Sequence, residues 1–168
     1  MQKRGSAAWI LLLGLLLGTA AFAQNNSLTG TWKLDVKQSD FGSDPAPKSL
    51  TVTVKDTQKM FSVHGRGIDD KGKTFSYSWS GPEDGSMHPG MSNGKVSGKM
   101  SARKEGDTLV RHSEDLDASS YDYRATVSSD GNTATEEMTG KDKGGKEVKQ
   151  KTVWHRAATQ KSAAKKSE

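Results

Sequence analysis

The sequence predicts an all-β protein: an antiparallel up-and-down meander of about eight to nine strands that follows a signal-peptide helix and closes into a barrel. Three observations carry this prediction. Apolar residues recur at every second position through most of the 168-residue chain, which is the period of a β-strand. Asp, Asn, Pro and Gly separate these runs at intervals of about ten residues, as hairpin turns do. No stretch beyond residue 23 has a sustained helical stripe.

The first 23 residues have the features of a secretory signal peptide. Lys3 and Arg4 precede an apolar run over residues 7–17, and residues 21–23 (Ala-Phe-Ala) form an A-x-A cleavage site. The apolar run is too short for a permanent membrane span. We therefore expect cleavage after residue 23 and a secreted protein, periplasmic or extracellular, with no membrane span in its mature form. An uncleaved N-terminal anchor is the alternative.

The composition limits the remaining possibilities. The chain has a net charge of +5, but this excess belongs mainly to its two ends. The middle is close to neutral, which argues against a nucleic-acid-binding surface. The absence of cysteine excludes disulfides, thiolate metal sites and thiol catalysis. We expect one barrel domain over residues 24–156 and a disordered basic tail over residues 157–168.

The predicted strands follow one another with strong turn signals between them. The alternating apolar runs lie, in order, over residues 32–36, 50–54, 61–63, 75–79, 96–102, 121–127 and 148–156. Turn-forming clusters lie at residues 44–47, 56–57, 69–72, 105–107, 130–132 and 143–145. One connection, Gly81 to Gly94, contains two prolines and is longer than the others. Long connections of this kind serve as lids or binding loops, so we expect this one to gate the mouth of the barrel.

Closure into a barrel follows from the two faces of each strand. One face is apolar, and the other consists of Lys, Thr, Ser and Asp. We therefore expect the apolar face to be buried and the polar face to be exposed to solvent. Closing the sheet buries the apolar face and removes both edges. A two-sheet sandwich remains the alternative. An outer-membrane barrel would need an apolar outer face, whereas residues such as Lys33 and Arg124 place charge there.

Motifs at the two ends of the predicted domain resemble a known family. Gly30-Thr31-Trp32 opens the first strand, and Trp154-His155-Arg156 closes the last. This combination resembles the lipocalin-like, or calycin, barrels. The resemblance implies that Arg156 packs across Trp32 at the closed end, beside Gly30, through a cation–π contact.

Two further resemblances extend this comparison. The run Gly30 to Leu34 is similar to the start of fatty-acid-binding proteins, although residues 37–48 are too few for the helical lid of that family. As a whole, the chain resembles small secreted bacterial proteins of unknown function that are described as lipocalin-like. They share the Gly-Thr-Trp-Lys-Leu start, the pattern of Lys37 to Phe41 and Asp-x-x-Gly-Lys hairpins. The family resemblance implies a barrel that binds a small molecule.

Large aromatic side chains share the predicted inner faces with a few polar ones. Aromatic residues with polar atoms suit the wall of a ligand pocket. We predict five ligand-binding residues: Tyr77, Trp79, Arg111, Tyr123 and Trp154. A buried arginine needs a partner. Arg111 therefore either pairs with Glu136 inside the barrel or meets an anionic head group of the ligand. If the strand register differs, Arg111 faces water.

No arrangement of catalytic residues or metal ligands is evident in the sequence. Residues 90–94 match G-x-S-x-G, but this motif needs a preceding strand and a following helix, and neither is predicted. His88 with Met87 and Met91 could bind copper, although a mobile loop explains the same residues. We predict no catalytic residue, no metal site and no cofactor. The expected function is non-enzymatic binding of a small apolar or amphipathic molecule. The alternatives are an envelope-associated or protein-interaction module with a filled barrel, and, less favoured, an enzyme.

Overall fold

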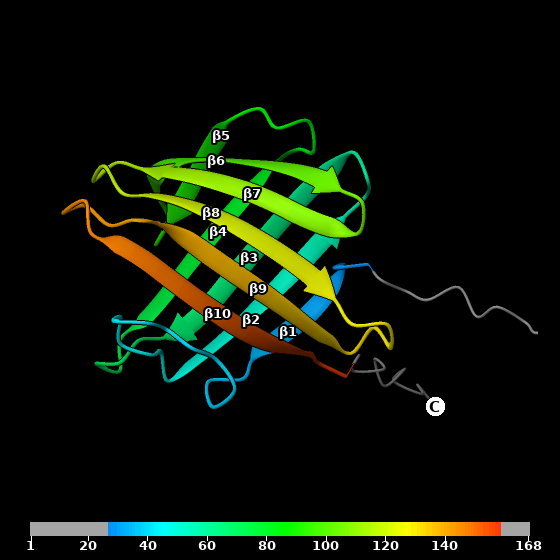
Figure 1. Ribbon diagram of the computed structural model, residues 1–168, viewed down its shortest axis with the longest axis horizontal. Helices are drawn as coiled ribbons and strands as arrows, with labels where there is room; N and C mark the ends of the chain where they lie inside the picture. Colours follow the sequence, from blue (N-terminus) through cyan, green and yellow to red (C-terminus); the bar gives the residue numbers. More distant parts are fainter. Residues whose placement is uncertain (1–26, 159–168) are drawn as a thin grey trace, which may run out of the picture.

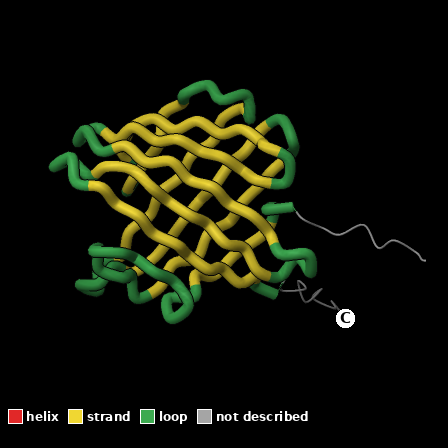
Figure 2. Tube along the Cα trace, in the orientation of Figure 1, coloured by secondary structure: helices red, strands yellow, loops and turns green. Residues whose placement is uncertain are grey.

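The computed structural model describes residues 27–158. Within this range the chain forms ten strands and no helix (Figure 1 and Figure 2). The signal peptide predicted for residues 1–23 and most of the tail predicted for residues 157–168 lie outside the described range. No helix long and apolar enough to cross a membrane is found among residues 27–158. The strands are β1 (Gly30–Leu34), β2 (Ser49–Asp56), β3 (Met60–Ile68), β4 (Thr74–Pro82), β5 (His88–Ser92), β6 (Lys95–Glu105), β7 (Thr108–Asp115), β8 (Ser120–Val127), β9 (Thr133–Lys141) and β10 (Glu147–Arg156).

The ten strands form one closed antiparallel barrel. Each strand pairs with its neighbours in the sequence, and β1 pairs with both β2 and β10. Trp32 of β1 lies opposite Val52 of β2 and Arg156 of β10. Pairing of the first strand with the last removes the two edges that an open sheet would expose. The all-β closed meander predicted from the sequence is confirmed, and the two-sheet sandwich is excluded.

The strands form because their side chains alternate between the barrel interior and its outer surface. In β2, Val52 and Val54 are buried, while Thr53 and Lys55, which alternate with them, are exposed. The same period recurs in the other strands, so the inner faces supply one continuous core. This core consists of Leu28, Trp32, Val52, Val54, Phe61, Val63, Trp79, Ala102, Leu109, Ala125, Ala134 and Trp154.

The two ends of the barrel differ in construction (Figure 1). The closed end carries residues 27–29 and the β2–β3, β4–β5, β6–β7 and β8–β9 connections. The open end carries the β3–β4, β5–β6, β7–β8 and β9–β10 turns and the long β1–β2 connection, residues 35–48. That connection is tied to β10 by paired backbone hydrogen bonds between Asp40 and Lys151 of 2.7 and 2.8 Å.

The barrel has ten strands, more than the sequence predicted, because the expected long loop contains β5. Pro89 and Gly90 interrupt the apolar alternation there, so the pattern did not indicate a strand. β5 joins β6 through a tight turn at Asn93 and Gly94, whose φ values of 49° and 77° suit a two-residue hairpin. Only residues 83–87 remain as a connection, and they lie at the closed end. The predicted gate over residues 81–94 is therefore wrong.

Candidate functional site

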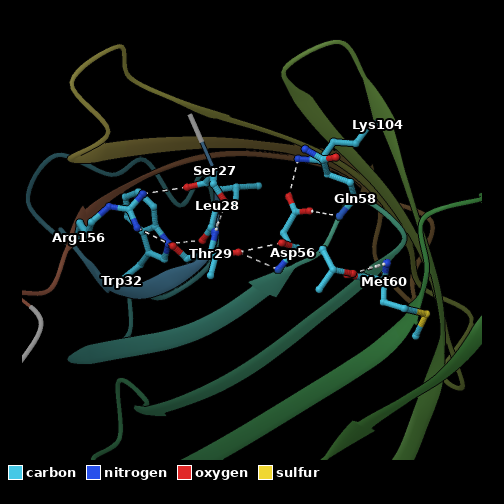
Figure 3. Close-up of polar contacts among 10 residues, drawn as sticks. Ser27, Leu28, Thr29, Trp32, Asp56, Gln58, Met60, Lys104 and Arg156 are labelled. Atoms are coloured by element: carbon cyan, nitrogen blue, oxygen red, sulfur yellow. Dashed lines mark hydrogen bonds and ion pairs between the residues drawn. The ribbon is translucent and has the colours of Figure 1, made fainter. Parts of the chain in front are cut away.

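A tryptophan and an arginine seal the closed end (Figure 3). The Trp32 side chain is 1% exposed, and its indole Nε1 donates a 2.8 Å hydrogen bond to the carbonyl oxygen of Leu28. The guanidinium carbon of Arg156 lies 4.2 Å from the centroid of the Trp32 ring, within the range of a cation–π contact. Leu28 is itself buried in the core, so the residues before β1 plug this end of the barrel.

Three backbone carbonyls hold the Arg156 side chain in place. Its Nε donates to Gly131, Nη1 to Thr29 and Nη2 to Ser27, over 2.6, 2.6 and 2.8 Å. Gly30 has a φ of 143°, and a Cβ there would lie 2.5 Å from Arg156 Nη1. A glycine at this position therefore permits the close approach of the guanidinium. The structure thus places Gly30, Trp32 and Arg156 together, in the arrangement that the family resemblance implied.

Two carboxyl groups and a lysine form a second polar cluster at the closed end. Asp56 at the end of β2 accepts hydrogen bonds from Lys104 Nζ at 2.7 Å and from the backbone nitrogen of Gln58 at 3.0 Å (Figure 3). Both carboxylate oxygens of Glu83 are buried, and no donor within residues 27–158 forms a hydrogen bond with them. Burial, followed by the charge of neighbouring Asp56, raises the pKa of Glu83. Burial also raises the pKa of Asp56, but the hydrogen bonds from Lys104 and Gln58 outweigh this effect and lower its pKa overall.

The interior near the closed end is packed, whereas the interior near the open end is hollow. Among the apolar core residues around Trp32 and Phe61, the remaining void measures only about 50 Å³. Towards the open end, a cavity of about 570 Å³ lies against the inner faces of β4 to β7. Its lining includes Tyr77, Trp79, Met100, Arg111, Ser113 and Tyr123.

A second cavity of about 340 Å³ lies under the β1–β2 connection. Phe41, Pro45 and Pro47 of this connection form part of its wall, and Trp154 of β10 forms another part. Gln150 also lines it and donates a 2.7 Å hydrogen bond to Asp44. The long segment at the mouth is thus residues 35–48, and no sequence pattern predicts that these residues line a pocket.

Tyr77, Tyr123 and Glu136 line both cavities. Tyr77 of β4 is opposite Gly65 of β3, and a Cβ at Gly65 would overlap the Tyr77 ring. The glycine therefore lets this ring lie flat against β3. Burial is the main cause that raises the pKa of both phenols, that of Tyr123 to about 12. Both hydroxyls are therefore neutral hydrogen-bonding groups at physiological pH.

A buried ion pair lies at the base of the larger cavity. Arg111 of β7 is 9% exposed, and its Nη2 donates to Glu136 Oε2 of β9. The guanidinium carbon lies 4.7 Å from the centroid of the Tyr123 ring, and Nη1 lies 3.9 Å from the sulfur of Met100. Burial acts to lower the pKa of Arg111, but the charge of Glu136 raises it overall. Of the alternatives considered for Arg111, the structure shows the internal pair.

Two polar atoms at this cavity are buried without a well-formed hydrogen bond among the described residues: Arg111 Nε and Ser113 Oγ. Ser113 Oγ nevertheless lies close enough to the Tyr123 hydroxyl to lower its pKa, so Arg111 Nε is the atom without any partner within residues 27–158. Ser113 is 7% exposed and lies two positions after Arg111 on the inner face of β7. A buried donor without an acceptor is unfavourable by about 1–3 kcal/mol. Such atoms are rare in folded proteins.

The structure brings the five predicted ligand-binding residues to the barrel interior, but not all to one cavity. Four of them line the larger cavity: Tyr77, Trp79, Arg111 and Tyr123. Trp154 lines the smaller cavity. Sequence reasoning missed two groups of lining residues. It missed Ser113, although this residue shares the phase of Arg111, and it missed the apolar residues of the β1–β2 connection, which follow no strand pattern.

The histidine and serine motifs do not form a catalytic or metal site in the described structure. Ser92 lies at the end of β5, before a hairpin turn and another strand, so residues 90–94 are not a strand–turn–helix elbow. His88 Nε2 lies 2.9 Å from Ser86 Oγ, which donates to Asp84. The serine therefore separates the carboxylate from the imidazole, unlike a catalytic triad. No cluster of three or more potential metal ligands is found in residues 27–158.

No known protein family matches the sequence, and no curated protein matches it either.

Proposed function

We propose that this chain is a secreted, non-enzymatic, lipocalin-like binding protein that holds a small, partly apolar molecule in the open half of its barrel. The cavity of about 570 Å³ at the open end carries this proposal. Its volume is within the range of small-molecule sites. Its lining of aromatic side chains with a few polar atoms is also typical of such sites. The sealed opposite end leaves the open end as the route of entry.

The lipocalin-like assignment rests on topology and on the closed-end seal rather than on the number of strands. Lipocalins close eight antiparallel strands into a barrel, whereas this barrel has ten. The shared features are the up-and-down order, the Gly-x-Trp start at Gly30 and the contact between Trp32 and Arg156. Secretion is supported by the signal-peptide pattern in residues 1–23.

The binding mechanism follows from the lining. Tyr77, Trp79 and Tyr123 supply apolar surface in the larger cavity, and burial of the ligand against them provides most of the affinity. Arg111 at the base of this cavity fixes the polar end of the ligand. Trp154 extends the aromatic wall into the smaller cavity. The two cavities favour this function over the alternative of an interaction module with a filled barrel, which would be packed at ordinary density.

Nile red, a neutral apolar dye, tests the proposal by its fluorescence when titrated into protein purified without detergent. We expect saturable binding to the wild type. Ser113→Phe fills the larger cavity and should weaken binding about tenfold or more. The matched control, His112→Phe, alters the neighbouring residue on the outer face of β7 and should leave affinity unchanged.

Native mass spectrometry of the same preparation then identifies any ligand that copurifies. Equal loss of dye affinity in Ser113→Phe and His112→Phe would contradict the cavity as the binding site. No dye uptake by the wild type, together with a clean protein mass, would favour the interaction module with no ligand.

A further inference from the structure

We propose that the polar end of the ligand is an uncharged hydrogen-bond acceptor, such as an amide or a ketone, and that Glu136 excludes carboxylates from the same position. This inference rests on the proposed function, because it specifies the chemistry of the molecule held in the larger cavity. Three features of the lining carry it: the internal neutralisation of Arg111, the available donor groups there, and the carboxylates around the two cavities.

The positive charge of Arg111 is already matched inside the barrel. Its Nη2 pairs with the Glu136 carboxylate, which lies on the inner face of β9 with a side-chain exposure of 21%. A ligand carboxylate would have to share the guanidinium with Glu136, and two carboxylates close together in a partly buried site repel one another. The ion pair therefore presents hydrogen-bonding groups to the cavity but no net charge.

The groups that remain available are donors. Arg111 Nε carries a proton and has no acceptor within residues 27–158. The Ser113 hydroxyl interacts with the Tyr123 hydroxyl, and it can rotate to donate to a ligand acceptor instead. Neither Arg111 Nε nor Ser113 Oγ is exposed to solvent, so bulk water does not replace the missing bonds. The Tyr123 ring lies over the guanidinium at 4.7 Å, and the proposed complex requires this ring to shift so that an acceptor reaches Nε. A carbonyl oxygen has two lone pairs and can accept from both donors.

The charges around both cavities disfavour an anion further. The smaller cavity is lined by four carboxylate residues and by no lysine or arginine; the four are Asp44, Asp69, Asp70 and Glu136. The lining of the larger cavity contains two further acidic residues, Asp115 and Asp117, and two basic residues, Lys99 and Arg111. An anionic ligand would thus meet an excess of like charge. A cation would be attracted at the rim, but it offers no acceptor to Arg111 Nε and would lie beside the guanidinium.

Three probes with the same alkyl chain separate these possibilities: decanamide, decanoate and decylammonium. Isothermal titration calorimetry at neutral pH, below the micelle concentrations, measures their affinities for the wild-type protein. Decanamide and decanoate have nearly the same shape and differ in charge. We expect decanamide to bind about tenfold or more tightly than decanoate, the difference expected from one hydrogen bond to a charged donor and the repulsion by Glu136.

Glu136→Gln provides the decisive variant because it leaves Arg111 without a counter-charge. This variant should raise the affinity for decanoate about tenfold, so that decanoate binds as tightly as decanamide or better. The control is Glu137→Gln, which makes the same chemical change at the next residue of β9, on the outer face. It should leave all three affinities unchanged. Near-ultraviolet circular dichroism of both variants verifies that the barrel is folded.

The outcomes that overturn this inference differ from those that overturn the proposed function. Wild-type binding of decanoate or decylammonium as tight as that of decanamide would refute the uncharged acceptor and leave a binding protein in place. Binding of Nile red without binding of any decyl probe would also refute the inference alone. Failure of the dye and all three probes would refute the proposed function together with it. An unchanged decanoate affinity in Glu136→Gln would show that Glu136 does not select the ligand.

Discussion

The closed end of the barrel and the base of the larger cavity each place an arginine over an aromatic ring, but the hydrogen-bonding groups of the two arginines are satisfied differently. At the closed end, Arg156 lies 4.2 Å from the Trp32 ring and donates to three backbone carbonyls. At the base of the larger cavity, Arg111 lies 4.7 Å from the Tyr123 ring and forms an ion pair with Glu136, and its Nε has no partner within residues 27–158. An arginine over an aromatic ring therefore stabilises the fold at the closed end, whereas beside the larger cavity its guanidinium remains partly available.

The tightness of the packing also differs between the closed end and the open end. The interior around Trp32 leaves a void of about 50 Å³, whereas the cavities near the open end measure about 340 and 570 Å³. A protein without cysteine has no disulfide to compensate for a hollow core. The closed half, in which backbone and side-chain groups are densely bonded, therefore supplies the stability that permits a hollow open half. Substitutions at matched positions in the two halves should show this difference.

The largest effect is expected for Trp32→Ala. Removal of this fully buried side chain, together with its hydrogen bond to Leu28, should destabilise the protein by about 3–5 kcal/mol. The matched substitution towards the open end, Tyr77→Ala, removes a mostly buried ring that borders existing cavities, so less packing is lost, and it should destabilise by only about 1–2 kcal/mol. Urea unfolding followed by circular dichroism measures both. Equal losses would show that the two halves share the stability evenly.

A smaller effect is expected when each arginine is replaced by lysine. Arg156→Lys retains the charge, but one ammonium group cannot reach three carbonyls that surround a planar guanidinium. We expect a loss of about 2 kcal/mol in the free energy of unfolding. Arg111→Lys keeps an ion pair with Glu136 and removes an unpartnered Nε, so the expected loss is about 1 kcal/mol or less. A larger loss for Arg111→Lys would mean that the open half carries more of the stability than its cavities suggest.

The barrel could be predicted from the sequence because its strands bury one face and expose the other. Alternation of apolar and polar residues, such as Val52 and Val54 with Thr53 and Lys55, reports this directly. β5 escaped prediction because Pro89 and Gly90 remove the alternation, and the strand is defined instead by hydrogen bonds to its neighbours. Local sequence patterns contain no record of such pairing between strands.

The candidate site could be predicted only in part, for a related reason. The phase of each strand placed Arg111 and Tyr123 on inner faces and offered Glu136 as a partner for the arginine. The cavity volumes depend on how side chains from many strands fill the interior, and no single strand determines them. Phe41 and Pro45 line the smaller cavity only because the β1–β2 connection folds over the mouth, and neither belongs to a periodic run.

The smallest effect concerns the carboxyl pair of the closed end, and it depends on pH. Burial and the nearby Asp56 raise the pKa of Glu83, so protonated Glu83 is favoured by folding. Its contribution to stability is present below the pKa of glutamate in the unfolded chain, about 4.3, and is lost as the pH rises through the higher pKa of the folded state. Glu83→Gln keeps this side chain neutral at every pH.

Glu83→Gln should therefore match the wild type near pH 4 and be more stable than the wild type near pH 8. The gain should be at most about 1 kcal/mol, because Glu83 is only partly buried as a whole residue and lies at the rim of the barrel, where nearby solvent screens its charge. Urea unfolding at both pH values measures the difference, with Glu137→Gln as the control on the outer surface. A variant less stable than the wild type near pH 8 would mean that ionised Glu83 is held by Lys104 together with Asp56. The closed end would then depend on a three-membered ion network, and the pH dependence would have the opposite sign.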